Sequence, residues 1–395
     1  MSSVFQRVLL VGASLLVAGL ILEGTIRILS PRTHSIVVEH LGGDIPSDVN
    51  LEIENDSARP LLVRTPTGIR LMQNSRAYIR NHPINGKDTV VETNSQGHRH
   101  RQLPPKSSRD HRVLMLGDSI TFGSYLPASE TIPAHIETRL QTLTKTSATQ
   151  LDFEVINAGI GGIDLQNELA ILLETSPAVE PDLVLVGLYL NDANASLYLE
   201  ILRLPAPFDK SRFFSWLFDR LHILRARLAA NAIARDSPGD LKVERSRFAR
   251  NHPISDERWE TSDTGFNRRI HRNFHDWGFA WSDTYWNKAR DLLSLMQTVA
   301  LEQGAEFAVV LFPVRMQVHA ENLRSEPQQR FEALMDDLGV AHLDLLPLLR
   351  EAYQDDGLDL FYDYCHYNAT GTSFVGKAIA DFLAREMNWV DPNEE

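Results

Sequence analysis

Cysteine is almost absent from this sequence, and its scarcity excludes two classes of protein. The single cysteine among 395 residues, Cys365, cannot form a disulfide within the chain, and a cysteine-based metal cluster needs several thiolates. Positive charge is also in deficit: 39 Lys and Arg stand against 52 Asp and Glu, which argues against general nucleic-acid binding. Because 43% of the residues are hydrophobic and 23% charged, a disordered or collagen-like chain is excluded as well. The length allows two or three domains, or one large α/β domain with insertions.

Long hydrophobic runs are scarce too, and the most prominent lies near the N-terminus. Residues 8–22 (VLLVGASLLVAGLIL) are 15 apolar or small residues, whereas a membrane-spanning helix needs about 20. The helical pattern continues to Leu29, and Glu23 and Arg27 are spaced to pair on one helix face. We therefore expect residues 1–30 to form a single-pass membrane anchor, with the rest outside the cytoplasm. A cleaved signal peptide and a buried core helix are the alternatives.

The rest of the chain divides into parts of different pattern. Residues 31–110 are rich in Pro, Arg and His, which predicts a loop-rich lead-in with short strands. Residues 111–192 and 282–390 alternate short apolar runs with helical periods, as in a parallel sheet covered by helices on both faces. The predicted strands lie at residues 112–116, 153–156, 183–187, 307–312 and 342–345. We predict an α/β fold of three layers, α/β/α, with a mostly parallel five-stranded sheet.

Residues 193–281 interrupt this alternation and have a composition of their own. They carry 13 Arg and 2 Lys against 11 acidic residues, a net of +4 in a chain of −13. Five of the six tryptophans lie in this segment or beside it. These rings form the core of a subdomain or, alternatively, a platform that stacks on sugars. We expect an inserted lid whose charge suits an anionic polymer.

Four short polar motifs lie at the ends of predicted strands or just before the last helix. They are residues 117–119 (GDS), 157–162 (NAGIGG), 191–192 (ND) and 363–366 (DYCH). In an open parallel sheet, reactive groups gather at the carboxyl ends of the strands, so we expect the motifs to lie together. Each motif alone is a weak signal, because such residues usually cap helices or form turns.

Together, the motifs supply the parts of a serine hydrolase. Ser119 offers a hydroxyl and a backbone N–H directly after a strand. His366, three residues after Asp363, is placed to bind that carboxylate at Nδ1 and to direct Nε2 toward a nucleophile. The Gly-rich turn and the amide of Asn191 offer further N–H groups, and three donors around one point form an oxyanion hole.

The ordered set resembles the SGNH/GDSL hydrolase superfamily of esterases, lipases, thioesterases and carbohydrate deacetylases. The resemblance covers about residues 112–385 outside the insertion, and its first block reads VLMLGDSIT at residues 113–121. It implies that Ser119 is the nucleophile, that His366 is the general base and that Asp363 is the carboxylate that orients this base. It also implies three oxyanion donors, which are Ser119, Gly162 and Asn191.

Two positions depart from the family pattern. Tyr367 follows His366 where the family usually has Pro, and Tyr189 stands where the family usually has Gly, two residues before Asn191. The turn at residues 94–97 (NSQG) and an N-terminal helix ending in Glu-x-x-x-Arg resemble those of membrane-tethered bacterial members. Some of those members serve cell-surface or exopolysaccharide acylation.

We therefore expect a serine ester hydrolase that acts through an acyl-enzyme on O-acyl groups, chiefly acetyl, of cell-surface or extracellular carbohydrate. Its expected partners are an ester-bearing substrate, such as an acylated anionic glycan, and the membrane; no metal, organic cofactor or nucleic acid is implied. An O-acyltransferase acting on a polysaccharide hydroxyl and a non-catalytic tethered carbohydrate-binding protein are the alternatives.

Other polar residues in the sequence are expected to have structural roles. His271 and His275 are four residues apart but lack a third metal ligand, so we expect a surface or capping role. Cys365 has no base of its own and is expected to be structural. Asp118 and Asp192 are expected to brace the loops around the oxyanion donors.

Overall fold

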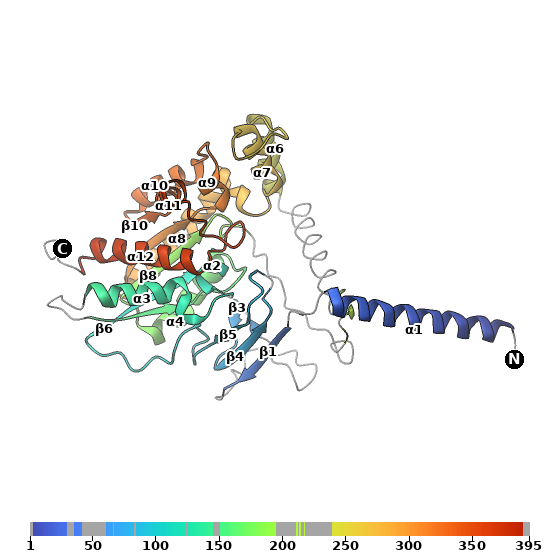
Figure 1. The fold of residues 1–395 in the computed structure, drawn as a ribbon. Helices are drawn as coiled ribbons and strands as arrows, with labels where there is room; N and C mark the ends of the chain where they lie inside the picture. Colours follow the sequence, from blue (N-terminus) through green and yellow to red (C-terminus); the bar gives the residue numbers. More distant parts are fainter. Residues whose placement is uncertain are drawn as a thin grey trace.

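A parallel sheet of five strands forms the centre of the protein (Figure 1). The structure is a computed structural model that describes residues 3–29, 35–41, 61–65, 67–82, 84–123, 125–144, 151–194, 211, 213, 214, 217 and 239–389. The strand order is β10-β9-β8-β6-β7, and every neighbouring pair is parallel. The strands are β6 (Asp110–Gly117), β7 (Asp152–Asn157), β8 (Leu183–Tyr189), β9 (Glu306–Phe312) and β10 (Ala341–Asp344).

Burial explains why four of these strands are continuous apolar runs in the sequence. Every residue of β8 is buried, and only the first one or two residues of β6, β7 and β9 are not. A strand covered on both faces has no solvent side and therefore no polar alternation. The predicted α/β fold with a five-stranded, mostly parallel sheet is confirmed.

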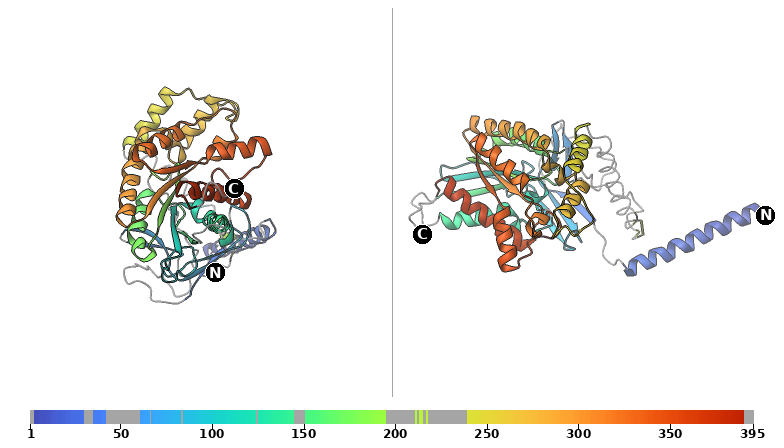
Figure 2. Two further views of the ribbon diagram at one scale, coloured as in Figure 1. Left: turned by 90° about the vertical axis from the view of Figure 1, so that its left-hand side faces the viewer. Right: turned by 90° about the horizontal axis from the view of Figure 1, so that it is seen from above.

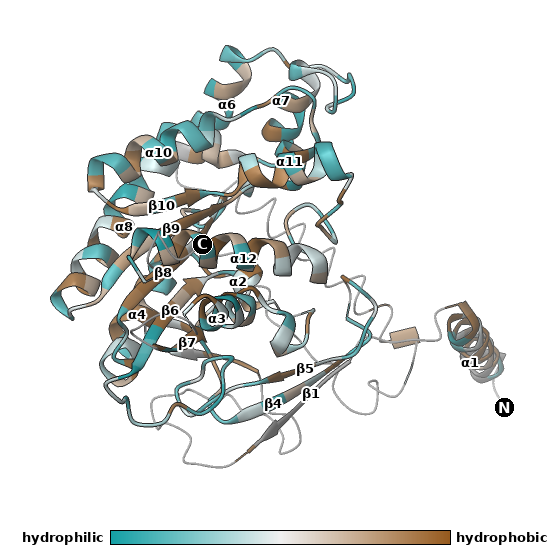
Figure 3. Ribbon diagram, turned by 60° about the vertical axis from the view of Figure 1, so that its left-hand side comes forward, coloured by the Kyte–Doolittle hydropathy of each residue, from teal (hydrophilic) through white to brown (hydrophobic). Residues whose placement is uncertain are grey.

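Helices cover both faces of the sheet (Figure 2). On one face α3 (Ile132–Leu143) packs against α12 (Ala369–Glu386). On the other face α4 (Leu165–Val179) and α10 (Glu326–Leu338) both pack against α8 (Asp283–Glu302). Figure 3 shows the apolar strands enclosed between these helices, as a three-layer arrangement requires. The shorter helices are α2 (Ser119–Phe122), α9 (Arg315–His319) and α11 (Leu346–Asp356).

The order in which the strands are added reverses direction at β6. The chain passes from β6 to β7 on one side and then to β8 on the other side of β6. The two connections leave the sheet toward opposite faces, so the loops that follow these strands diverge at their carboxyl ends. Ligands of open α/β sheets bind at such a point.

The lead-in forms two small antiparallel units. One is a three-stranded sheet in the order β1-β4-β5, and the other is the pair β2-β3. The predicted short strands are therefore present, at β1 (Ser35–His40), β2 (Leu62–Thr65), β3 (Gly68–Leu71), β4 (Ser75–Arg80) and β5 (Thr89–Glu92).

The longest described part of the insertion, residues 239–281, packs into the same hydrophobic core as the sheet. It forms α6 (Gly239–Asn251), α7 (Asp263–Arg272) and the 3₁₀ helix η3 (Trp277–Trp281). Its buried aromatic residues are Phe248, Phe266, Phe274, Trp277, Phe279 and Trp281. Rings buried in this way are not exposed for stacking on sugars, so core packing accounts for them. Trp216 and most of residues 193–238 lie outside the described residues, and so does the part of the predicted lid that they form.

The N-terminal residues form a helix, as predicted. α1 (Ser3–Leu29) has 27 residues, and Arg27 pairs with Glu23 at 2.8 Å. Glu23 Oε2 also accepts hydrogen bonds from Ser211 Oγ at 2.7 Å and from the N–H of Phe213 at 2.9 Å. Across the part of the chain that the structure describes, no helix combines the length and apolarity needed to cross a membrane. The predicted transmembrane helix is therefore not supported.

Candidate active site

The motifs that follow β6, β7 and β8 meet at the carboxyl edge of the sheet. The N–H of Ile160 donates to the carbonyl of Gly117 at 3.1 Å, which ties the Gly-rich turn to the end of β6. A Cβ on Gly161 would lie 3.7 Å from the Cβ of Ser119, so this turn runs alongside the serine. The edge therefore brings together the first three predicted motifs.

The chain turns sharply between β6 and Ser119. Gly117 has φ 152°, and a Cβ there would lie 2.2 Å from Thr121 Oγ1, so only glycine fits. Asp118 caps the helix α2 that follows, because its Oδ1 accepts from the N–H of Ile120 at 2.8 Å. Ser119 is the first residue of α2 and is half-buried, which leaves its hydroxyl accessible.

Three side chains from distant parts of the sequence form a continuous hydrogen-bonded chain. Ser119 Oγ lies 2.9 Å from His366 Nε2, and His366 Nδ1 lies 2.8 Å from Asp363 Oδ2. The other oxygen of Asp363 accepts from the N–H groups of Cys365 at 2.9 Å and His366 at 2.8 Å. The structure thus assembles the three residues that the sequence motifs singled out.

The surroundings of Asp363 favour its charged form. Burial by itself would raise the pKa of Asp363, but hydrogen bonds and charge from His366, with the two backbone N–H groups, lower that pKa below its usual value. An ionised carboxylate only accepts, so Nδ1 of His366 carries the proton of their hydrogen bond. Nε2 is then the acceptor for the hydroxyl proton of Ser119.

Aromatic rings restrict the motion of His366. The ring of Tyr125 meets the imidazole edge-on, with centroids 5.2 Å apart, and Tyr125 contacts Tyr362 in the same way at 5.5 Å. Tyr125 is almost fully buried. The imidazole is thus held on its side by packing and at Nδ1 by Asp363.

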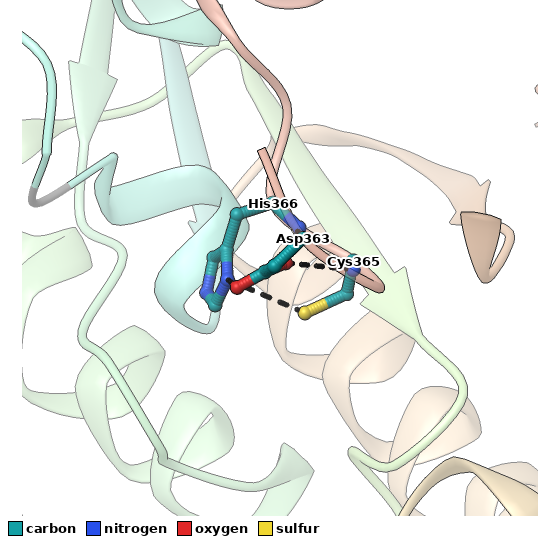
Figure 4. Close-up of side chains that lie close together, drawn as sticks. All are labelled: Asp363, Cys365 and His366. Carbon is teal, nitrogen blue, oxygen red and sulfur yellow. Dashed lines mark hydrogen bonds and ion pairs between the residues drawn. The ribbon is translucent and has the colours of Figure 1, made fainter. Parts of the chain in front are cut away.

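Cys365 lies next to the triad without the properties of a nucleophile (Figure 4). Its Sγ is 3.5 Å from His366 Nδ1, and burial raises the pKa of this thiol well above its usual value. The thiol therefore stays protonated and does not provide the thiolate that attacks carbonyls or binds metals.

Within the described ranges, Asp363, Cys365 and His366 are the single cluster of three potential metal ligands. Asp363 and His366 already bind each other, and the protonated thiol is a poor ligand, so the set does not fit a metal ion. No third ligand joins His271 and His275 in the described part of the chain.

Two backbone N–H groups beside Ser119 are placed to act as oxyanion donors. Gly162 has φ 79°, a left-handed conformation that glycine adopts without strain. Neither the N–H of Ser119 nor that of Gly162 donates to an acceptor in the described residues. Both are thus available to a substrate oxygen.

The amide of Asn191, the third predicted donor, is held by a residue of the insertion. Asn191 Nδ2 donates to Asp276 Oδ1 at 2.8 Å, and Asn194 Nδ2 donates to the backbone carbonyl of Asp276, also at 2.8 Å. Asp276 is buried, and that burial raises the pKa of its carboxyl. No sequence signal predicted Asp276, because it lies 85 positions from Asn191 and belongs to no motif.

A second missed residue, Arg99, supports the nucleophile from the lead-in. Its Nη1 donates to the carbonyls of Phe122 at 2.7 Å and Gly123 at 2.6 Å, and its Nη2 donates to the carbonyl of Leu126 at 2.5 Å. Burial lowers the pKa of Arg99 to about 10, so it remains charged at neutral pH. The one available signal was the turn at residues 94–97, which Arg99 follows.

Asp118 and Asp192 brace the loops, as predicted. Asp192 Oδ2 accepts from the N–H of Tyr189 at 2.6 Å, which closes the turn that presents Asn191. Beneath them Glu168 is fully buried, and neither carboxyl oxygen has a hydrogen-bond partner in the described part of the chain. Burial, with Asp118 nearby, raises the pKa of Glu168 well above its usual value.

Comparisons with known proteins give distant structural likenesses. No protein-family model and no curated protein sequence matches the chain. A two-domain esterase active on acetylated mannans is 14% identical, with a TM-score of 0.40, and the match covers 72% of this chain and 51% of that one. This chain therefore spans about half the length of that esterase.

Two further solved structures match over nearly their whole length. TesA is 13% identical with a TM-score of 0.36, and the match covers 70% of this chain and 99% of TesA. The acetylxylan esterase Axe2 from Geobacillus stearothermophilus, in a catalytic-mutant form, is 14% identical with a TM-score of 0.39, covering 72% of this chain and 97% of Axe2. Likeness at this level carries no argument about the reaction, which rests on the geometry described above.

Proposed function

We propose that this protein is a serine ester hydrolase that acts through an acyl-enzyme. The observation that carries the proposal is the hydrogen-bonded chain from Ser119 Oγ through His366 to Asp363, with distances of 2.9 and 2.8 Å. A binding protein without turnover has no use for this chain of groups. The arrangement is that of a nucleophile, a general base and the carboxylate that orients the base.

The geometry supports a two-stage reaction. Ser119 Oγ bonds to the ester carbonyl carbon while its proton passes to His366 Nε2. The ester C–O bond then breaks, and the proton passes to the leaving alcohol. Water attacks the acyl carbon and gives a proton to Nε2, and that proton returns to Oγ as the acid leaves. The N–H groups of Ser119, Gly162 and Asn191 stabilise the oxyanion in both stages.

The proposed substrate is an O-acylated, anionic carbohydrate with acetyl as the acyl group. Support comes from the net +4 charge of residues 193–281 and from exposed arginines on α6 and α7, including Arg250 and Arg269. Opposite charge steers a polymer toward the site, and this effect weakens as salt rises.

A pair of charge reversals tests this substrate class. Arg250→Glu with Arg269→Glu should slow deacetylation of an anionic acetylated polysaccharide and leave p-nitrophenyl acetate hydrolysis unchanged. Lys377→Glu on α12 serves as the matched control, because it is also an exposed basic residue. Equal rates on the polysaccharide for all variants, at low and high salt, would reject an anionic substrate.

The nucleophile itself is tested by Ser119→Ala. This variant should retain its fold and lose ester hydrolysis, and a serine-directed phosphonate should label the wild type at Ser119. Ser246→Ala, which removes an exposed hydroxyl on α6, is the control and should behave as wild type. Full activity in Ser119→Ala would overturn the assignment. Adding an acceptor glycan to the wild type distinguishes transfer from hydrolysis, because an acyltransferase yields acylated glycan instead of free acid.

The location of the enzyme is a separate proposal that rests on the sequence. We propose that the N-terminal residues keep the catalytic domain on the outer side of the cytoplasmic membrane, as the apolar residues 8–22 predict. Fractionation of the full chain against one that begins at Arg32 tests it. Intact chain in the soluble fraction would reject the tether, and a shortened chain there would indicate a cleaved signal peptide.

A further inference from the structure

Asp276 connects the insertion to both sides of the active site. Its carboxylate accepts a hydrogen bond from Asn191 Nδ2 at 2.8 Å. Tyr364, which lies between Asp363 and His366 in the sequence, is close enough to Asp276 to interact with it electrostatically. The steps of the proposed reaction do not use this buried carboxyl group.

We propose that Asp276 is a positioning residue that orients the amide of Asn191 for transition-state stabilisation. The inference rests on the proposed function, because it assigns a role within the same oxyanion hole. A side-chain amide has two N–H donors on one end and an oxygen on the other. Asp276 takes one N–H and leaves the second for the substrate oxygen.

The acceptor oxygen of Asp276 selects between the two orientations of the Asn191 amide. If the amide were turned over, its oxygen would face the acceptor oxygen of Asp276, and the hydrogen bond from Nδ2 would be lost. The same rotation would direct an oxygen, instead of an N–H, to the side where the substrate oxyanion forms. The hydrogen bond to Asp276 therefore favours the orientation that serves catalysis.

Asp276 is itself held firmly, as this role requires. Only 8% of its surface is exposed, and the adjoining Trp277 and nearby Phe274 are buried in the hydrophobic core. Its N–H donates to the carbonyl of Asn273 at 2.9 Å, and its carbonyl accepts from Asn194. A rigid acceptor fixes the amide within the narrow range of positions that an oxyanion donor needs.

The competing interpretation is that Asp276 only fastens the insertion to the sheet. In that case, removing the Asp276 side chain lowers stability and has the same effect on activity whether or not Asn191 is present. A double-mutant cycle separates the two, because residues that act as a unit give effects that do not add. The variants are Asp276→Ala, Asp276→Asn, Asn191→Ala and the two combinations with Asn191→Ala.

We expect Asp276→Ala to lower kcat on p-nitrophenyl acetate by about 10-fold or more with little change in KM, since a small misplacement of a catalytic group has this size of effect. Asp276→Asn keeps an acceptor oxygen but also donates, so it no longer excludes the wrong orientation and should give an intermediate kcat. Both losses should vanish in the Asn191→Ala background. Phosphonate labelling of Ser119 and the thermal unfolding midpoint are measured for every variant.

The inference would be overturned if each Asp276 substitution lowered kcat by the same factor in the Asn191→Ala background as in the wild type. It would also be overturned if both Asp276 variants had the kcat of the wild type. If Asp276→Ala does not fold, the near-isosteric Asp276→Asn carries the same test in both backgrounds. Failure of the proposed function is recognised separately, because then Ser119→Ala would keep its activity and Ser119 would not be labelled.

Discussion

The triad and the oxyanion hole are built from the sequence in different ways. Asp363 and His366 lie three positions apart, and one turn of the chain fixes their contact. Folding then only has to bring this pair to Ser119. Asn191 instead depends on Asp276, 85 positions further along and in a segment outside the strand–helix alternation. Contacts that close within a short segment are visible as motifs. Contacts that orient a side chain from afar exist only once the chain has folded.

The first test of this contrast concerns the orienting carboxylate, for which we expect the largest effect. Asp363→Asn keeps the shape of the side chain but does not stabilise the imidazolium, and it favours the wrong tautomer of His366. We expect kcat to fall by about 10²-fold or more, by analogy with other triads. The measurement is steady-state hydrolysis of a small activated ester.

Asp359→Asn is the matched control for that variant. Asp359 lies in the same loop and pairs with Arg315, away from His366. It should keep nearly full activity. An Asp363→Asn variant as fast as wild type would show that the triad of Ser119, His366 and Asp363 does not catalyse the reaction.

The second test addresses the oxyanion side. Asn191→Ala removes one side-chain donor, and the loss of one such donor costs about 10²-fold in kcat. KM should change little, because the donor serves the transition state more than the bound ester. Asn322→Ala, at an exposed position, is the control. A change confined to KM would make Asn191 a ground-state binding residue.

The sequence predicted the sheet and the triad because both leave short-range signals. Buried strands are apolar runs, and each strand-end motif keeps its own residue types together. The helices α9 and α11 were not predicted, because they are short and carry no distinct motif between the last two strands and the final helix. Arg99 and Asp276 were not predicted either, since the role of each depends on a partner that only the fold brings near. The tryptophans distinguished residues 193–281 from the rest of the chain by composition. They could not show whether their rings face the core or the solvent.

The third test measures the support beneath the nucleophile and should affect stability more than chemistry. Arg99→Ala removes a buried guanidinium that binds three carbonyls at the end of α2. Hydrogen bonds to a charged group contribute about 1.5–3 kcal/mol each to a buried site, so we expect a loss of about 3 kcal/mol or more in the free energy of unfolding. Denaturant unfolding measures it.

Arg101→Ala is the matched control for Arg99. Arg101 is exposed and pairs with Glu137 at the surface, where such a pair contributes about 0–1 kcal/mol, and with Glu154, which Arg112 also holds. If the two variants were equally stable, the carbonyls at the end of α2 would not depend on Arg99. The lead-in would then cover the nucleophile helix without bracing it.

The smallest effect is expected at Cys365, which lies within the triad loop and takes no part in the chemistry. Its thiol is buried, and its raised pKa keeps it protonated, so Cys365→Ala removes neither a nucleophile nor a charge. Its backbone N–H, which donates to Asp363, is retained by alanine. We expect kcat and KM close to wild type and a loss of about 1 kcal/mol in unfolding free energy from the small cavity. Ester hydrolysis and denaturant unfolding of the same sample check both values. A loss of activity comparable to that of Asp363→Asn, with the fold intact, would show that the thiol contributes to the reaction and that the triad side has a fourth member.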